Sequence, residues 1–260
     1  MKLDNLRIIP VYHGKVNFSK LVRRAFHEFN PDIIAVELPR DIGDNILRAT
    51  ERLPILSIVG YVEGKLTGME NQTVNPSQPG LMFDPRYTFI PIQPTDPMID
   101  GIRLAIENDR QIEFIDILVE NYIPREFNLP DDEVLESIDK FSEFRDLLTA
   151  NLPKSDRGSV DFERELCMAS RIAELVGSDQ KVMAIIGLAH YARVKEFLEN
   201  GKTVAVQEPY KHEKQQIFNV DPLSSDLVLE EIPYLAFLYE VHYTIHEKGI
   251  APEDALEMLT

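Results

Sequence analysis

Short apolar runs and stretches with helical spacing alternate along the first thirty residues. The run Leu6–Tyr12 contains β-branched residues and ends at His13 and Gly14, a pattern that predicts a buried strand followed by a turn. From Phe18 to Asn30 the apolar positions recur at the spacing of one helix face, and Ser19 is placed to cap the start of the helix. This part of the chain therefore predicts a strand, a turn and an amphipathic helix.

A second strand follows this helix almost at once. Pro31 lies just past the helix, and residues Ile33–Leu38 read IIAVEL, an apolar run interrupted only by Glu37. A continuous apolar run is typical of an inner parallel strand that is covered on both faces. The N-terminal region therefore predicts a βαβ unit, in which both strands run in the same direction.

The alternation of strands and helices resumes after a long irregular stretch. Residues Gly60–Arg86 hold Gly, Pro, Asn, Gln and Thr with little periodicity, which predicts a long loop or lid. The sequence then predicts a strand at Phe89–Ile92, a helix capped by Thr95 or Asp96, and a strand at Ile112–Val119.

The second half of the chain combines helices with two further strands. Residues Asp131–Leu152 and Val160–Val176 are amphipathic stretches separated by the segment PKSDRGS, and we interpret them as a helical insertion at about residues 128–178. Beyond it the pattern predicts a strand at Lys181–Ile186, a turn at Gly187–His190 and a helix at Tyr191–Asn200. A final strand at Thr203–Val206 and a helical C-terminal extension at about residues 225–260 are predicted to follow. Residues 1–260 thus predict a single α/β domain with a largely parallel central sheet flanked by helices.

The composition narrows the class of protein. The 260 residues include 27 Lys and Arg against 44 Asp and Glu, a net charge of −17, which disfavours nucleic acid as a partner. A single cysteine, Cys167, excludes a disulfide-stapled module. No apolar run approaches the ~20 residues of a membrane span and the N-terminus lacks a signal peptide, so we expect a cytoplasmic protein that does not enter a membrane. The apolar stretch IPYLAFLYEV near the C-terminus would serve either a homodimer contact or a cover for the sheet.

Three residues that can carry chemistry follow separate strands of the predicted sheet. His13 follows the first strand, Glu37 lies at the end of the second, and His190 follows the strand at Lys181–Ile186. The carboxyl ends of parallel strands open onto one edge of a sheet, which is where ligands bind in open α/β folds. Because we expect the first two strands to be neighbours about 4.8 Å apart, the three side chains are predicted to converge in one pocket.

Glu37 is the most informative of the three, since a carboxylate inside an apolar strand must be ion-paired, hydrogen-bonded, protonated or metal-bound. The structural alternative is an ion pair with Arg40 or Arg164. Two chemistries suit the trio. In the first, His13, Glu37 and His190 hold a divalent metal ion that activates water. In the second, a histidine removes a proton from water directly, while Arg40 or Arg164 binds an anionic substrate group.

Other candidates are better explained by structure. His242 and His246 are four residues apart, but the residue after His242 is Tyr where a zincin helix needs Glu. Asp96, Asp100 and Asp116 are further acidic candidates at this edge, although Asp96 suits a helix cap and Asp116 the end of a strand. The sequence has no Gly-rich phosphate loop, nucleophile elbow or Cys-x-x-Cys motif, which disfavours nucleotide-dependent, serine-hydrolase and thiol-redox enzymes.

Three segments, taken in order, resemble a known family. They are PDIIAVELPR at residues 31–40, FERELCMAS at residues 162–170 and VMAIIGLAHYARV at residues 182–194. Together they resemble the TraB/PrgY, GumN and Tiki group of the EreA/ChaN-like superfamily. The resemblance spans about residues 7–200, and it departs from the family where Pro10 stands in place of the Gly that opens the first motif.

The resemblance implies an EreA/ChaN-like α/β fold in which His13, Glu37 and His190 share a pocket and Arg40 and Arg164 occupy basic positions. Members of the group include metal-dependent proteases, esterases with a catalytic histidine, a haem-binding lipoprotein and an inhibitor of peptide pheromone activity, so the fold alone does not choose the activity. Our leading hypothesis is a hydrolase of peptide, amide or ester bonds that uses His13, Glu37 and His190 as the reaction centre and Arg40 and Arg164 to bind a peptide or small-molecule substrate. The alternative is a non-catalytic binding or regulatory protein that holds a peptide, haem or anionic metabolite in the same pocket.

Overall fold

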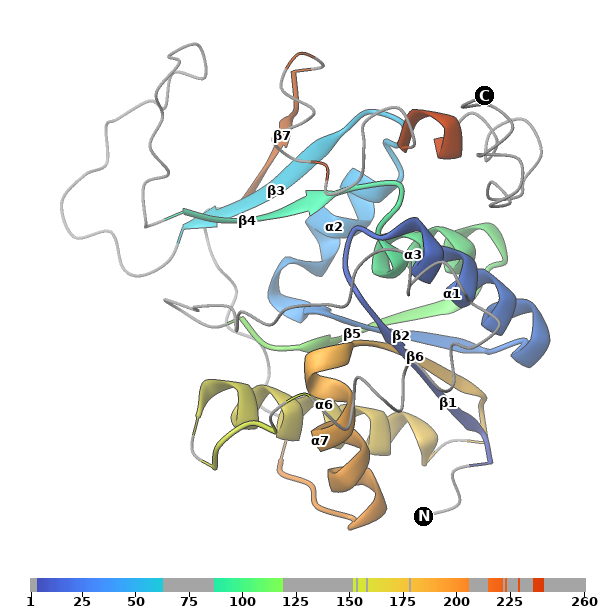
Figure 1. The fold of residues 1–260 in the computed structure, drawn as a ribbon, viewed down its shortest axis with the longest axis vertical. Coiled ribbons are helices and arrows are strands. Elements are labelled where there is room, and N and C mark those ends of the chain that lie inside the picture. Colours follow the sequence, from blue (N-terminus) through green and yellow to red (C-terminus); the bar gives the residue numbers. More distant parts are fainter. Residues whose placement is uncertain are drawn as a thin grey trace, which may run out of the picture.

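The computed structural model describes residues 4–62, 87–118, 152, 154–157, 159–177, 179–205, 215–221, 223, 229 and 236–240. Within these ranges the chain forms two β-sheets and the helices that pack on them (Figure 1). Several sequence-based predictions lie outside the described residues: the loop from residue 63 to residue 86, the helix at residues 131–151, most of the C-terminal extension, and the pair His242 and His246.

Within the described ranges, four parallel strands form the central sheet, in the order β1–β6–β2–β5 (Figure 1). Their bounds are Leu6–Val11 for β1, Val182–Gly187 for β6, Ile33–Pro39 for β2 and Gln111–Asp116 for β5. The predicted class, α/β with a parallel sheet flanked by helices, is confirmed. The expectation that β1 and β2 are direct neighbours is wrong, because β6 lies between them and pairs with both. Strand order depends on pairing between distant parts of the chain, which the local pattern does not report.

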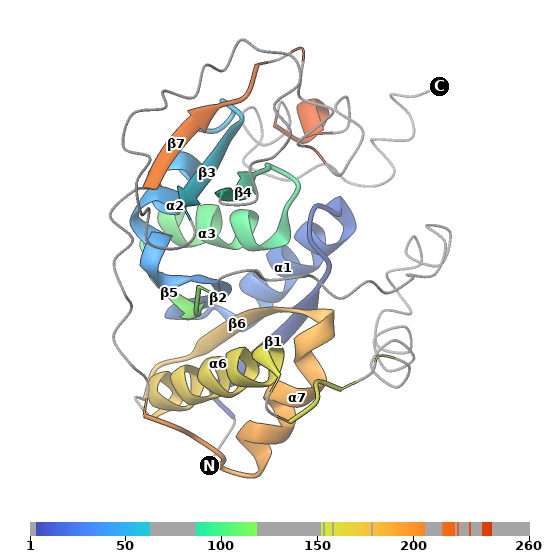
Figure 2. The ribbon, with the colours of Figure 1, turned by 90° about the vertical axis from the view of Figure 1, so that its left-hand side faces the viewer.

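Helices cover both faces of this sheet, so the body of the protein has three layers (Figures 1 and 2). One face carries α1 (Val16–Phe29) and α3 (Pro97–Glu107), and the other carries α6 (Val160–Val176) and α7 (Leu188–Glu199). The predicted bounds of the helix Val160–Val176 are confirmed, and this helix packs on the sheet together with α7. Among the helices of the described ranges, none combines the length and the apolar composition needed to span a bilayer.

Side-chain alternation along β2 decides which groups meet on each face of the sheet. Ile34 and Val36 belong to the core beneath α1 and α3, whereas Ile33 and Ala35 belong to the core beneath α6 and α7. Successive side chains of a strand point to opposite faces. Glu37, two residues after Ala35, therefore points toward α6 and α7.

The starts of α1 and α3, which lie near the carboxyl edge of the sheet, agree only in part with the prediction. Asp96, one of the two predicted candidates beside Thr95, caps α3. The prediction that Ser19 caps α1 is wrong: the helix begins after Lys15, about one turn earlier, and the side chain of Lys15 makes no capping hydrogen bond. The buried hydroxyl of Ser19 instead donates a hydrogen bond to the carbonyl oxygen of Thr95 at 2.7 Å, which ties α1 to the start of α3.

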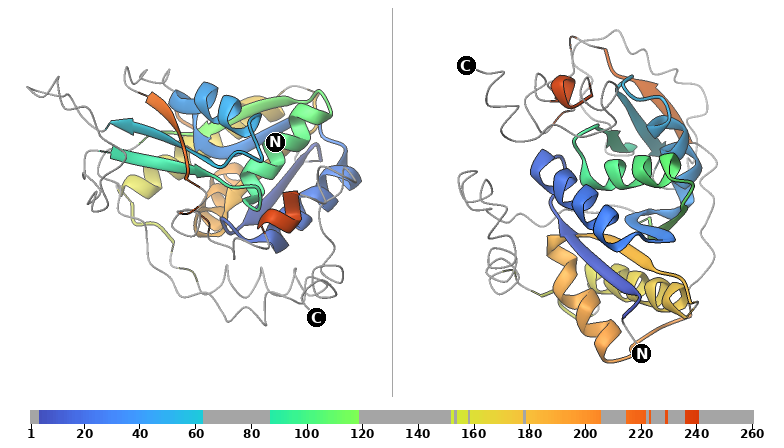
Figure 3. Two further views of the ribbon diagram at one scale, coloured as in Figure 1. Left: turned by 90° about the horizontal axis from the view of Figure 1, so that it is seen from above. Right: turned by 90° about the vertical axis from the view of Figure 1, so that its right-hand side faces the viewer.

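A second, antiparallel sheet lies on the side of the central sheet that carries α1 and α3 (Figure 3). Its strand order is β4–β3–β7, with bounds Tyr87–Ile92, Ser57–Val62 and Gln215–Asn219 respectively. The 3-10 helix η1 (Arg40–Ile42) and the helix α2 (Gly43–Thr50) lead from β2 to this sheet, and α2 packs against it. The strand predicted at Phe89–Ile92 is confirmed, but it belongs to this second sheet and does not continue the parallel one.

Three further local predictions differ from the structure. Gly60 lies inside β3, so the predicted loop does not begin there. The predicted turn at Gly187–His190 is the last residue of β6 and the first turn of α7, because the strand runs directly into the helix. Residues 203–205 do not form the predicted final strand: they are exposed, and the amide of Val204 donates a hydrogen bond to the hydroxyl of Ser170 in α6.

Candidate functional site

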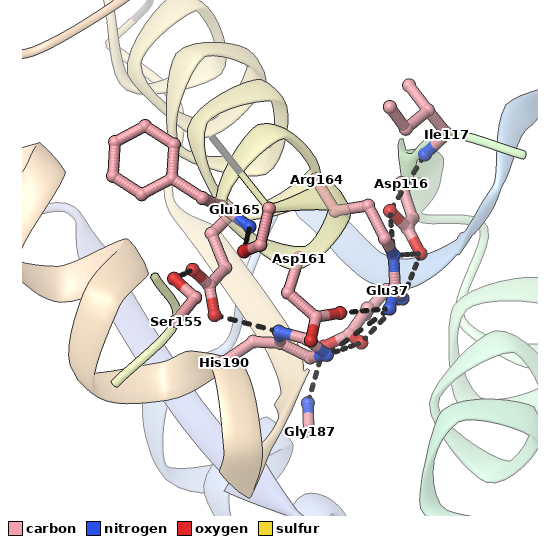
Figure 4. A network of polar contacts seen from close by, with 11 residues as sticks. Glu37, Asp116, Ile117, Ser155, Asp161, Arg164, Glu165, Gly187 and His190 are labelled. Atoms are coloured by element: carbon pink, nitrogen blue, oxygen red, sulfur yellow. Dashed lines mark hydrogen bonds and ion pairs between the residues drawn. The ribbon is translucent and has the colours of Figure 1, made fainter. Parts of the chain in front are cut away.

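Glu37, Arg164 and His190 meet at the carboxyl edge of the central sheet, on the face covered by α6 and α7 (Figure 4). They come from β2, from the first half of α6 and from the first turn of α7. Oε1 of Glu37 lies 3.3 Å from Nη2 of Arg164 and 3.5 Å from Nε2 of His190, which is itself 3.4 Å from Nη1 of Arg164. Each of these residues is at most 9% exposed. The structure therefore joins three of the five residues that the sequence singles out.

Arg164 is the centre of this cluster. Its guanidinium donates to both oxygens of Asp116 at the end of β5, with 2.6 Å between Nη2 and Oδ2, and it lies 3.4 Å from Asp161, one turn earlier in α6. The planar fork of an arginine can serve several carboxylates at once. Because these carboxylates and that of Glu37 surround one guanidinium, the cluster favours a second positive charge on His190.

Two carboxylates hold the imidazole of His190. Its Nδ1 lies 3.0 Å from Oε1 of Glu165, a fully buried residue of α6, and its Nε2 faces Glu37. Burial alone would lower the pKa of His190. The charge of Glu37 and the hydrogen bond to Glu165 outweigh both burial and the opposing charge of Arg164, so the pKa of His190 is raised above its ordinary value of 6.5. The ring can therefore carry a proton near neutral pH.

Both carboxylate oxygens of Glu37 have partners. The backbone N–H of Gly187, at the junction of β6 and α7, donates to Oε2 at 2.7 Å, while Arg164 donates to Oε1. A side chain at position 187 would crowd this carboxylate, since an added Cβ would lie 3.3 Å from Oε2. The absence of a Cβ at Gly187 therefore allows the backbone to approach Glu37 closely.

His13 pairs with a different carboxylate. Its Nδ1 lies 2.9 Å from Oδ2 of Asp96, and the same oxygen accepts a hydrogen bond from the amide of Gly14. The other oxygen of Asp96 accepts from the amides of Met98 and Ile99 at the start of α3. Burial alone would raise the pKa of Asp96, but His13 and these two amides lower it below its ordinary value of 3.8. Asp96 is therefore a buried, ionised carboxylate, whereas 47% of the His13 side chain is exposed.

The strand order explains why His13 and Glu37 have different partners. Because β6 separates β1 from β2, their carboxyl ends are two strand spacings, or about 10 Å, apart. In contrast, β1 and β6 are direct neighbours, and Val11 pairs with Gly187 where the two strands end. His13 therefore follows the strand next to the one that leads into His190.

Arg40 lies outside the buried cluster: it is the exposed first residue of η1, directly after β2. The predicted metal ligands His13, Glu37 and His190 do not fit a metal ion well. Across the described residues, no group of three or more His, Cys, Asp and Glu side chains is arranged to hold one. In addition, the guanidinium of Arg164 lies beside Glu37 and His190, where it would repel a metal cation.

Reasoning from the sequence missed Glu165 and Asp161. With Arg164 they occupy positions i, i+3 and i+4 of α6, and the same face continues through Met168 and Ile172 into the core. Charged residues on the apolar face of an amphipathic helix must be paired when the helix packs. That spacing was the available signal for a buried polar cluster at this end of α6.

Comparisons with known proteins do not identify the chain. No family model, no curated protein and no solved structure matches it. The likeness to the TraB/PrgY, GumN and Tiki group therefore stays an expectation drawn from three short segments.

Proposed function

We propose that the protein is a hydrolase of peptide, amide or ester bonds with its reaction centre at the carboxyl edge of the central sheet. The observation that carries this proposal is the contact, at 2.9 Å, between the half-exposed imidazole of His13 and the buried carboxylate of Asp96. An ionised carboxylate only accepts hydrogen bonds, so Nδ1 of His13 carries the proton and Nε2 is the basic nitrogen of the neutral ring. A general base needs a tautomer and an orientation fixed in this way.

In the proposed reaction, His13 takes a proton from a water molecule whose oxygen attacks the carbonyl carbon of the substrate. His190 follows the neighbouring strand and has a raised pKa, so it gives a proton to the leaving amine or alcohol as the bond to the carbonyl carbon breaks. The proton returns from His13 to His190 through solvent, and the net change is hydrolysis. Arg164 and Glu37 hold His190, and the exposed Arg40 binds an anionic group of a peptide or small-molecule substrate.

We favour this route over a metal-bound water for a physical reason. His13 and His190 have separate carboxylate partners, and the positive charge of Arg164 already lies beside Glu37 and His190. Imidazole chemistry uses these contacts as they stand, whereas a metal site would require Arg164 to move. We propose in addition that the fold is EreA/ChaN-like, as the sequence resemblance implies.

The test compares point variants on one library of esters, amides and peptides. Asp96→Asn keeps a good helix cap but removes the charge that fixes His13. We expect His13→Asn and Asp96→Asn to lower kcat/KM about 10²- to 10⁴-fold on any substrate that the wild type cleaves. His27→Asn is the matched control, because His27 is exposed in the last turn of α1, at the opposite end of the helix. Equal turnover by the wild type and His13→Asn would overturn the proposal, and so would the absence of hydrolysis across the library.

A non-catalytic binding protein is the second candidate, and one observation favours it. Arg164 donates to one oxygen of Glu37 and the amide of Gly187 to the other, so this carboxylate has the contacts of a structural group. Under this alternative the edge holds a peptide, haem or anionic metabolite without converting it. Titration calorimetry with these ligands, together with a Soret band for haem, would support binding if no substrate of the library is cleaved.

A further inference from the structure

Both histidines at this edge turn Nδ1 toward a buried carboxylate. For His13 the carboxylate is Asp96, and for His190 it is Glu165, at 3.0 Å. Glu165 is 0% exposed, so its charge must be offset by partners inside the protein. In the described part of the chain those partners are the ring of His190 and the hydroxyl of Ser155.

Ser155 holds the second oxygen of this carboxylate. Its hydroxyl, buried with the rest of the residue, donates to Oε2 of Glu165. The backbone carbonyl of Ser155 accepts a hydrogen bond at 2.6 Å from Arg193, which lies in α7 almost one turn after His190. Ser155 is thus bonded to both α6 and α7. With Oε2 bound to Ser155, Oε1 of Glu165 is directed at Nδ1 of His190 (Figure 4).

We infer that Glu165 and Ser155 are positioning residues for His190: Ser155 orients the carboxylate of Glu165, and Glu165 keeps a proton on Nδ1 so that Nε2 faces Glu37 and Arg164. The catalytic consequence rests on the proposed function. The tautomer and the orientation of the ring are properties of the folded protein alone, and they can be measured without a substrate.

Among the residues that the structure describes, the charged groups that face the ring of His190 come from β2 and α6. Glu37 approaches from β2, and Arg164 and Glu165 approach from α6. Glu37 and Glu165 favour the charged ring, whereas Arg164 and burial oppose it. Without the charge of Glu165, Glu37 alone would offset burial and Arg164, so the pKa of His190 would fall. Two further carboxylates, those of Asp116 in β5 and Asp161 in α6, lie against Arg164.

The test follows the ring nitrogens of His190 by NMR during a pH titration of the whole chain, with His190→Asn to assign the signals. In the wild type we expect the neutral ring to carry its proton on Nδ1. Glu165→Gln keeps the size of the side chain but removes the charge, so His190 should titrate at lower pH than in the wild type. Ser155→Ala keeps the charge of Glu165 but frees its carboxylate, so the neutral ring should show a mixture of tautomers. Glu163→Gln, the same change at an exposed position of α6, is the matched control and should leave His190 unchanged.

Two results would overturn the inference. The first is a titration of His190 in Glu165→Gln that coincides with that in Glu163→Gln, and the second is a neutral wild-type ring protonated on Nε2. If Glu165→Gln fails to fold, the Ser155→Ala variant tests the inference in its place. An unchanged tautomer of His190 in Ser155→Ala would show that Ser155 does not orient Glu165 toward the ring.

Activity gives a separate readout once a substrate is found. Glu165→Gln should lower kcat about tenfold or more with little change in KM, and it should move the alkaline limb of the pH profile to lower pH. Absence of hydrolysis would reject the proposed function while the NMR result still stands, so the two failures can be told apart.

Discussion

Replacing Arg164 with Met removes the positive charge that Glu37, Asp116 and Asp161 share. These carboxylates have side chains only 4–9% exposed, so water cannot take the place of the guanidinium. Met is similar in length to Arg but apolar, so the packing of α6 against the sheet is largely kept. The loss is therefore mainly that of the buried charge and its hydrogen bonds.

The expected cost follows from this burial. Removing one partner of a buried ion pair costs about 3–5 kcal/mol, because it leaves an uncompensated charge in a poorly solvated site. With a urea m-value of about 3 kcal/mol/M, Arg164→Met should unfold at a midpoint about 1–1.7 M below that of the wild type at neutral pH. Arg164→Lys keeps the charge but loses the planar fork, so its urea midpoint should lie between those of the wild type and Arg164→Met.

Urea unfolding followed by far-UV circular dichroism measures these midpoints, since the chain has no Trp to serve as a fluorescent probe. Arg24→Met is the matched control: Arg24 is 62% exposed and pairs with Glu28 on the surface of α1, a contact worth about 0.3–0.5 kcal/mol. If the midpoint of Arg164→Met lies as close to the wild type as that of Arg24→Met, the buried cluster does not stabilise the fold as the distances indicate.

Three further outcomes can be measured by unfolding. Gly101→Ala should lower the free energy of unfolding by about 1–3 kcal/mol, because the added Cβ would lie 2.3 Å from Cδ1 of Ile185. Ile185→Val removes that Cδ1 atom, so the losses of the two single variants should not add in the double variant. A double variant that loses the full sum would contradict this explanation. Gly187→Ala should lower the free energy of unfolding by about 1–3 kcal/mol, because the added Cβ would displace Glu37 from the amide at position 187. A urea midpoint equal to that of the wild type would argue against so close a contact. The difference in free energy of unfolding between the wild type and His190→Asn should be largest below pH 6.5, and it should decline as the pH rises through the raised pKa of His190 in the folded protein. A difference that does not depend on pH would show that protonation of His190 does not stabilise the fold.

The elements of the central sheet and its helices were largely predictable because each is specified by neighbouring residues. The apolar run around Glu37 identified β2, and helical spacing identified the bounds of Val160–Val176. The errors fall where local pattern is ambiguous. The Gly187–His190 segment looks like a turn but begins a helix directly, and residues 203–205 have strand-like composition but are exposed and pair with no strand in the described part of the chain.

The candidate site shows the same division. Chemistry within the sequence was enough to single out Glu37, since a carboxylate in an apolar strand needs a partner, and to name Arg164 among the two arginines considered. The pairing of His13 with Asp96 was not predicted, because Asp96, although a further acidic candidate at this edge, was better explained as the cap of α3. The carboxylate of Asp96 both caps α3 and binds His13, and only the tertiary structure, which brings the start of α3 next to the turn after β1, reveals the second contact.

The sequence by itself determined most of the strands and helices of the central sheet, which face of each is apolar, and which side chains require a buried partner, because these properties depend on spacing along a few turns or a few strand positions. The tertiary structure alone decided that β6 lies between β1 and β2, and therefore that His190 joins Glu37 while His13 joins Asp96. Strand order minimises the free energy of burial over the whole chain, and that sum includes contacts between residues far apart in sequence.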